Sequence, residues 1–204
     1  MRLCRPTTAA AVAALLGVLL VSCVSVRSPR VVFDASQTWE QRRAMLQQLD
    51  GFELRGRLAA RNAEQGVSAS IHWLQKGADS DLSLQGPLGI GGLQIRLRGD
   101  NLHLTTARGV EFDGEAARHA MIQSLGFEPP LAQLRYWVLG VPAPQSAGTE
   151  SLDAAGRRLL SLQQSDWQVQ FEADPTTTNE VRPKRLTATR GTTRVRLLVD
   201  RWGR

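Results

Sequence analysis

Residues 51–61 read GFELRGRLAAR, and this stretch decides the fold. Every second position from Phe52 to Ala60 holds an apolar residue or glycine, while the positions between them are mostly charged, beginning with Glu53 and Arg55. An alternation with period two is typical of a strand with one buried and one exposed face. The stretch therefore predicts a sheet that packs on one side only.

The same period recurs along the rest of the chain. It marks residues 67–73, 93–98 and 102–106, and Leu82 and Leu84 begin another strand. Towards the C-terminus the pattern predicts four more strands, at 158–163, 167–172, 184–189 and 193–199. Turn residues separate neighbours, which favours an antiparallel meander of about ten strands. Because strong twist prevents large flat sheets, the predicted fold is mainly β with α, with a curled antiparallel sheet.

A helix is predicted before the first strand. Thr38 and Gln41 have the spacing of a capping box, Trp39 and Leu46 lie on one helical face, and Gly51 is expected to end the helix. The folded domain starts here.

Two more helices interrupt the strands. Asp113 is placed to cap a helix that Gly126 ends, and Pro129-Pro130 begins another that stops before Gly140. Both are apolar on one side, so we expect them to cover the concave face of the sheet.

The N-terminal segment has the layout of an export signal. Arg2 and Arg5 precede an apolar run at 9–21, which reaches roughly 20 Å and is too short for the ~30 Å core of a bilayer. Leu20-Val21-Ser22-Cys23 follows and resembles the lipobox of bacterial lipoproteins. We therefore predict a signal peptide at 1–22, lipid attached to Cys23, a flexible tether at 23–37 and a folded domain at 38–204.

Composition limits the remaining possibilities. Loss of Cys4 with the signal and acylation of Cys23 leave no disulfide. Removal of Arg2 and Arg5 lowers the basic residues from 25 to 23, against 19 acidic. An exported, tethered chain of this balance is not expected to bind nucleic acid, and the small excess favours anionic lipid headgroups or an acidic protein partner.

No enzyme or metal site is predicted. His72, His103 and His119 have no partner at metal-ligand spacing, and the mature chain holds no nucleophile motif. No cofactor is expected apart from the lipid on Cys23. A lipid-anchored scaffold without ligand and, less favoured, a lipid-anchored hydrolase stay open at this point.

The Gly-rich segment at 86–92 is unusual. It lacks the Lys-Ser/Thr pair of a phosphate loop and runs into alternating strand, so a hairpin connection is expected. Leu88 and Ile90 lie where loop tips are usually polar. They either tuck into the core or mark a contact site.

These features occur together in one known family. The lipobox, the helix with Trp39, the strand at 51–57, the loop Gly86-Pro87-Leu88-Gly89 and the helix end at 137–142 resemble, in order and spacing, the LolB family of outer-membrane lipoprotein receptors. The resemblance implies a half-open β-barrel of about eleven strands, with a helical lid over an apolar cavity. It also implies that Leu88 projects to insert acyl chains into the membrane. Ile90-Gly91-Gly92 departs from the family pattern.

The resemblance implies partners and a location as well. Lipoprotein acyl chains, the periplasmic carrier LolA and the outer membrane are the expected partners of a monomeric chain. Val24 after the lipidated cysteine, in place of Asp, favours the outer membrane facing the periplasm. We expect the acyl-chain cavity to include Leu54, Leu58, Ile71, Trp73, Leu82, Leu84, Leu93, Ile95, Leu97, Met121, Leu125, Leu134 and Trp137.

Overall fold

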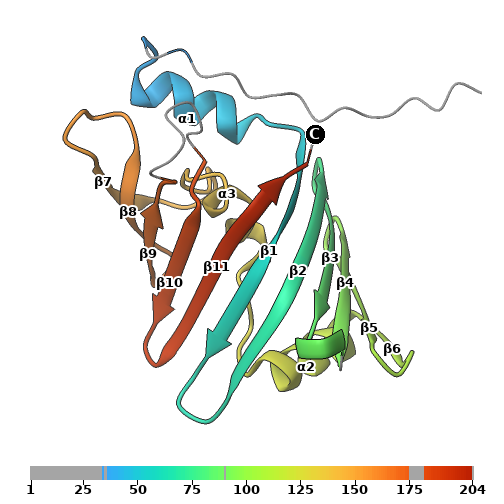
Figure 1. Cartoon of the computed structure of the whole chain (residues 1–204). Helices are drawn as coiled ribbons and strands as arrows, with labels where there is room; N and C mark the ends of the chain where they lie inside the picture. The colour runs from blue at the N-terminus through green and yellow to red at the C-terminus, as the bar shows by residue number, and fades with distance from the viewer. Residues whose placement is uncertain (1–33, 35, 90, 175–181, 204) are drawn as a thin grey trace, which may run out of the picture.

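The computed structural model describes residues 34, 36–89, 91–174 and 182–203. Its strands are β1 (Gly51–Arg61), β2 (Gly66–Lys76), β3 (Asp79–Gln85), β4 (Gly92–Arg98), β5 (Asn101–Thr106), β6 (Glu111–Asp113), β7 (Gly148–Leu152), β8 (Leu159–Gln164), β9 (Trp167–Glu172), β10 (Arg185–Arg190) and β11 (Thr193–Trp202). They form one antiparallel sheet in the order β6-β5-β4-β3-β2-β1-β11-β10-β9-β8-β7. The sheet curls but does not close, since its end strands β6 and β7 do not pair (Figure 1). The predicted fold class is confirmed.

The sheet has eleven strands where the alternation predicted about ten. The strands β6 and β7 are short, and most of their residues are polar, so neither shows a run of alternating apolar side chains. They are the two edge strands of the sheet. Each is recognised as a strand by its hydrogen bonds to a single neighbour, β6 to β5 and β7 to β8.

The first and last strands of the domain pair at the centre of the sheet. The register between β1 and β11 shifts at Arg55 and Gly56, because Asp200 is an extra residue on β11. At this bulge a Cβ on Gly56 would lie 2.2 Å from the carbonyl oxygen of Leu198, so only glycine fits. The glycine in the decisive stretch is therefore explained by close approach of the two strands.

The alternating apolar residues form one core on the inner face of the sheet. Leu54, Ile95 and Leu104 are almost wholly buried, and Trp73 lies opposite Leu54 on β2. Phe52 packs edge-on against Trp73, with ring centroids 5.3 Å apart. Arginines and carboxylates occupy the other face, as the alternation predicts.

Helix α1 (Trp39–Gln47) starts at the predicted capping box, in which Thr38 and Gln41 bond reciprocally. The prediction that Gly51 ends this helix was wrong. Gln48 is the C-cap, and Gly51 opens β1, where a Cβ would lie 2.3 Å from the carbonyl oxygen of Gln75. Gly51 is thus required by strand packing.

Helices α2 (Gly114–Leu125) and α3 (Leu131–Trp137) lie on the inner face of the sheet (Figure 1). Gly126 ends α2 in the left-handed conformation, as predicted. Asp113 stands at the N-cap but makes no capping bond, which corrects the prediction. Its carboxylate instead lies 2.7 Å from Nδ1 of His103 on the neighbouring strand.

A buried glutamine joins the second helix of this cover to the sheet. The Oε1 atom of Gln164 accepts from Nε1 of Trp137 at 2.8 Å and from the backbone N–H of Ala143 at 2.9 Å. Its Nε2 donates to the carbonyls of Ala143 and Ser146. Gln164 is 2% exposed, so every polar group of its amide is satisfied inside the core.

The turn between β7 and β8 is organised by Asp153. Its carboxylate accepts from the backbone N–H groups of Arg157 and Arg158, at 2.7 and 3.2 Å. Burial raises the pKa of Asp153, but these two N–H groups and the two guanidinium groups outweigh it and hold the pKa below its usual value. The charged carboxylate is therefore the form that stabilises this turn.

The predicted signal peptide, Cys23 and most of the tether lie outside the described residues. Every helix and strand of the described chain falls between Trp39 and Trp202. Among the helices that the structure describes, none has the length and apolar character needed to cross a membrane.

Candidate functional site

A large hollow opens between the inner face of the sheet and α2. Its volume is about 840 Å³, and residues of strands β1 to β6 and of α2 form its walls. The walls are mostly apolar, with Val67 and Ala69 on β2, Phe112 on β6 and Leu125 on α2 among them. This hollow lies at the end of the sheet where the η1 turn (Pro87–Gly89) connects β3 to β4.

The predicted cavity residues divide into three groups. Leu58, Leu84, Leu93 and Leu125 line this hollow. Leu97 and Met121 line a second hollow of about 710 Å³ between the sheet and α3, which also has several charged and polar residues. The remaining predicted residues pack in or against the core: Leu54, Ile71, Trp73, Leu82, Ile95, Leu134 and Trp137.

Some wall residues were not among those predicted. Val67 and Ala69 belong to the alternating stretch on β2 and could have been taken from that pattern. Phe112 lies in the middle of a strand of only three residues and Val110 directly precedes it, and alternation does not detect so short a strand.

Leu88 lies at the rim of the hollow and points away from the protein. It occupies the η1 turn (Pro87–Gly89), has φ of 58°, and is 96% exposed. A left-handed conformation is unfavourable for a leucine, and here it turns the side chain out of the sheet. Leu88 is therefore not part of the core, while Ile90 lies outside the described residues.

A second apolar residue stands on the same rim. Val110, in the turn between β5 and β6, is 49% exposed and lines the same hollow as Pro87. Arg108, also exposed, precedes it in that turn. The rim thus presents apolar tips from two separate turns, with a cation beside one of them.

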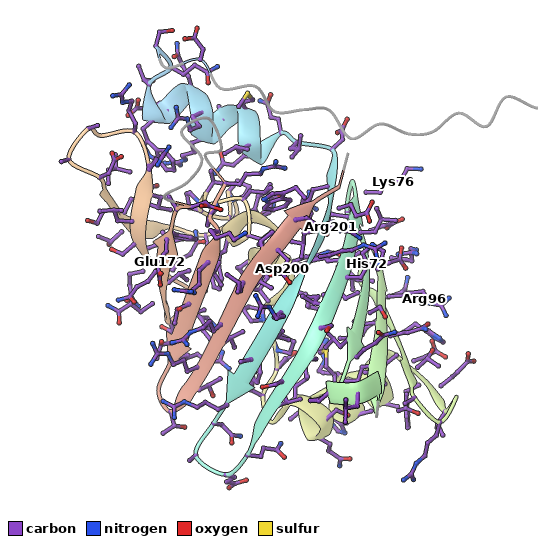
Figure 2. The ribbon with its side chains drawn as sticks, in the orientation of Figure 1. His72, Lys76, Arg96, Glu172, Asp200 and Arg201 are labelled. Carbon is purple, nitrogen blue, oxygen red and sulfur yellow. The ribbon has the colours of Figure 1, made fainter. Side chains whose placement is uncertain are left out.

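The histidines make surface pairs. Nε2 of His72 lies 2.8 Å from Oε1 of Glu53, and both side chains are partly exposed on the outer face that Figure 2 presents. Within the described ranges, no three metal-binding side chains come together. The apolar hollow and its rim are therefore taken as the candidate functional site.

The sequence of the chain matches a known family. A family model described as outer membrane lipoprotein LolB matches residues 50–202, which include all the strands of the sheet. The chain belongs to the LolB family. The outer-membrane lipoprotein LolB of Nitrosococcus oceani is 31% identical over 186 residues, covering 91% of this chain and 92% of that protein. LolB of an Azoarcus species is 32% identical over 194 residues, covering 95% and 94%.

A solved structure supports the fold. A LolA superfamily protein from Nitrosomonas europaea superimposes with a TM-score of 0.52, covering 82% of this chain and 94% of that one, at 10% identity. Membership of the LolB family assigns the chain to the lipoproteins of the outer membrane and to lipoprotein localisation. Leu88, which the family resemblance predicts to project, is the most exposed of the large apolar side chains described.

Proposed function

We propose that this chain accepts lipoproteins from a periplasmic carrier of the LolA type and transfers their acyl chains into the outer membrane, acting as a monomer. The observation that carries the proposal is the apolar hollow of about 840 Å³ with the exposed Leu88 on its rim. Ligand pockets usually measure about 300–1,000 Å³, so the hollow is of a size to hold acyl chains.

The energetics of such a transfer require no catalysis. Each buried CH₂ gains about 0.8 kcal/mol, and the gain is similar in an apolar hollow and in a bilayer. Acyl chains can therefore pass from one to the other down a modest difference in affinity, without a chemical fuel. This supports a receptor that is not an enzyme.

Leu88 on the rim orients the hollow towards the membrane. An exposed leucine that enters the membrane interface gains at most about 1.5–3 kcal/mol, enough to orient the hollow towards lipid without anchoring the protein. The anchor in this proposal is the lipid on Cys23, which keeps the domain at its destination and raises the local concentration of membrane.

The test separates acceptance from release. A fluorescently labelled lipoprotein is passed from the LolA carrier to the chain, and then from the chain to vesicles, and each step is timed. Leu58→Asp places a carboxylate on the wall of the hollow and should impair acceptance. Leu88→Glu should leave acceptance nearly intact and slow release.

Leu160→Glu is the matched control. Leu160 is exposed on β8 and lines neither the hollow of about 840 Å³ nor the hollow of about 710 Å³. Leu160→Glu should change neither step. Normal acceptance by a folded Leu58→Asp protein would refute the cargo role of the hollow. Equal losses of both steps in Leu88→Glu would refute the role of Leu88 in release.

A further inference from the structure

A separate groove lies on the outer face of the sheet, on the opposite side of β2 from the large hollow. It measures about 360 Å³ and lies over β1, β2 and β11, next to the η1 turn. Two arginines and two serines lie along it, among apolar residues. Its outer-face lining includes Arg57, Arg196, Ser68, Ser70, Leu198 and Pro87.

The register explains why the groove exists. Ala59 on β1 lies between Ser68 on β2 and Arg196 on β11, and Arg57 lies opposite Ser70. Ala59, Ser68 and Ser70 have short side chains, so the space between the side chains of Arg57 and Arg196 is left unfilled. Both serines are exposed, and their hydroxyl groups are therefore available to a molecule in the groove.

The positive charge at this end of the sheet is not balanced. Arg61 and Arg194 are direct cross-strand neighbours, an arrangement that is unfavourable for like charges. Arg57 shares its charge with Asp200, whose Oδ1 lies 3.0 Å away. The side chain of Arg196 is exposed and forms no ion pair or hydrogen bond with any residue of the described ranges.

The groove adjoins the mouth of the inner hollow. Both are lined by Leu58, Ser68, Ala69 and Pro87. The reason is that β3 ends at Gln85, opposite Ser70, so the start of β2 runs on without a neighbour from β3. A group held in the groove therefore lies beside both the open end of the hollow and the turn that carries Leu88.

We propose that this groove binds the phosphodiester of an anionic phospholipid headgroup of the membrane. Arg196, assisted by Arg57, supplies the charge, since guanidinium groups match phosphate oxygens in pairs. Ser68 and Ser70 donate hydrogen bonds from their hydroxyl groups. A headgroup bound here holds the rim of the hollow against the bilayer surface, on the side where Leu88 enters it.

The test measures vesicle binding without cargo, so it does not depend on acyl transfer. The chain from Val24 onward, which keeps every described helix and strand, is mixed with phosphatidylcholine vesicles with or without phosphatidylglycerol. Arg196→Gln should bind phosphatidylglycerol vesicles about fivefold more weakly, equivalent to about 1 kcal/mol per basic residue near an anionic surface. Binding to phosphatidylcholine alone should not change.

Arg201→Gln is the matched control. Arg201 lies on the same strand and the same outer face, opposite Arg55 and about 16 Å from Arg196 at the usual rise of a strand (Figure 2). Removal of this charge should weaken binding less than twofold. Equal losses of vesicle affinity in Arg196→Gln and Arg201→Gln would show that net charge alone attracts the vesicles, and would refute headgroup binding in the groove.

Two further arms complete the design. Ser70→Val keeps every charge but fills the groove, and it should also weaken binding to phosphatidylglycerol vesicles, with an unchanged unfolding midpoint. Inorganic phosphate at matched ionic strength should not displace the vesicles, and displacement would assign the groove to free phosphate. Unchanged vesicle binding in Arg196→Gln, with weaker carrier binding, would assign it to an acidic protein surface.

Discussion

Replacement of Leu88 by glycine separates a role in the fold from a role at the membrane. The side chain is 96% exposed, so its removal exposes no core. A left-handed leucine costs about 1–2 kcal/mol, which glycine relieves. Glycine in turn loses about 0.5–1 kcal/mol through the entropy of the unfolded chain. We therefore expect the free energy of unfolding to stay within about 1 kcal/mol of the wild type.

The effect on release should be much larger. Insertion of a leucine side chain into lipid is worth at most about 1.5–3 kcal/mol, and 1.4 kcal/mol corresponds to a factor of ten. Leu88→Gly should thus slow transfer of a labelled lipoprotein to vesicles by about tenfold, and by up to about a hundredfold. The measurement pairs urea unfolding with the rate of release.

Leu88→Met is the control for this experiment, because it keeps an apolar side chain in the same backbone conformation. It should release cargo at nearly the wild-type rate. The reasoning fails if Leu88→Gly releases cargo normally, or if it unfolds several kcal/mol more easily than the wild type.

Four further outcomes are expected. Gln164→Leu leaves four buried polar partners without a hydrogen bond and should lower the free energy of unfolding by about 3 kcal/mol or more, as measured in urea; a loss below about 1 kcal/mol would contradict the network. Gly56→Ala forces a methyl group against the carbonyl of Leu198 and should cost about 1–3 kcal/mol, seen as a lower melting temperature. The folded pKa of Asp153 lies below its unfolded value, so its contribution to the free energy of unfolding is complete above about pH 4 and is lost as the pH falls further. Asp153→Asn should therefore be less stable than the wild type at neutral pH, and this difference in stability should shrink in acid. Cys23→Ala should abolish acylation and outer-membrane fractionation while the domain stays folded, and its recovery in salt-washed membranes would count against lipid attachment at this position.

The sequence predicted the strands that have a clear period of two. The alternation starts at Phe52, and the end of β1 at Arg61 agrees with the prediction, whereas its start at Gly51 does not. The edge strands were missed because three to five mostly polar residues carry no period. Gly51 was assigned to the wrong element because a glycine before a strand and one after a helix look alike in sequence.

The candidate site was less accessible to sequence reasoning. Alternation shows which face of a strand is apolar, but it does not show where along that face the core ends and a hollow begins. Ile95 and Leu93 lie on the same face of β4 and both belong to the core, yet only Leu93 also lines the hollow. The position of α2 and the end of β3 decide this difference, and both are properties of the assembled sheet.

The central pairing of β1 with β11 also determines the order of folding. Hairpins such as β1 with β2 join residues that are near in sequence, whereas Leu54 must wait for Trp202, almost at the end of the chain. Contacts of such long range form slowly. Until β11 pairs with β1, strands β1 to β6 and β7 to β10 are two unjoined meanders with apolar faces uncovered, and such a state is the most prone to aggregate.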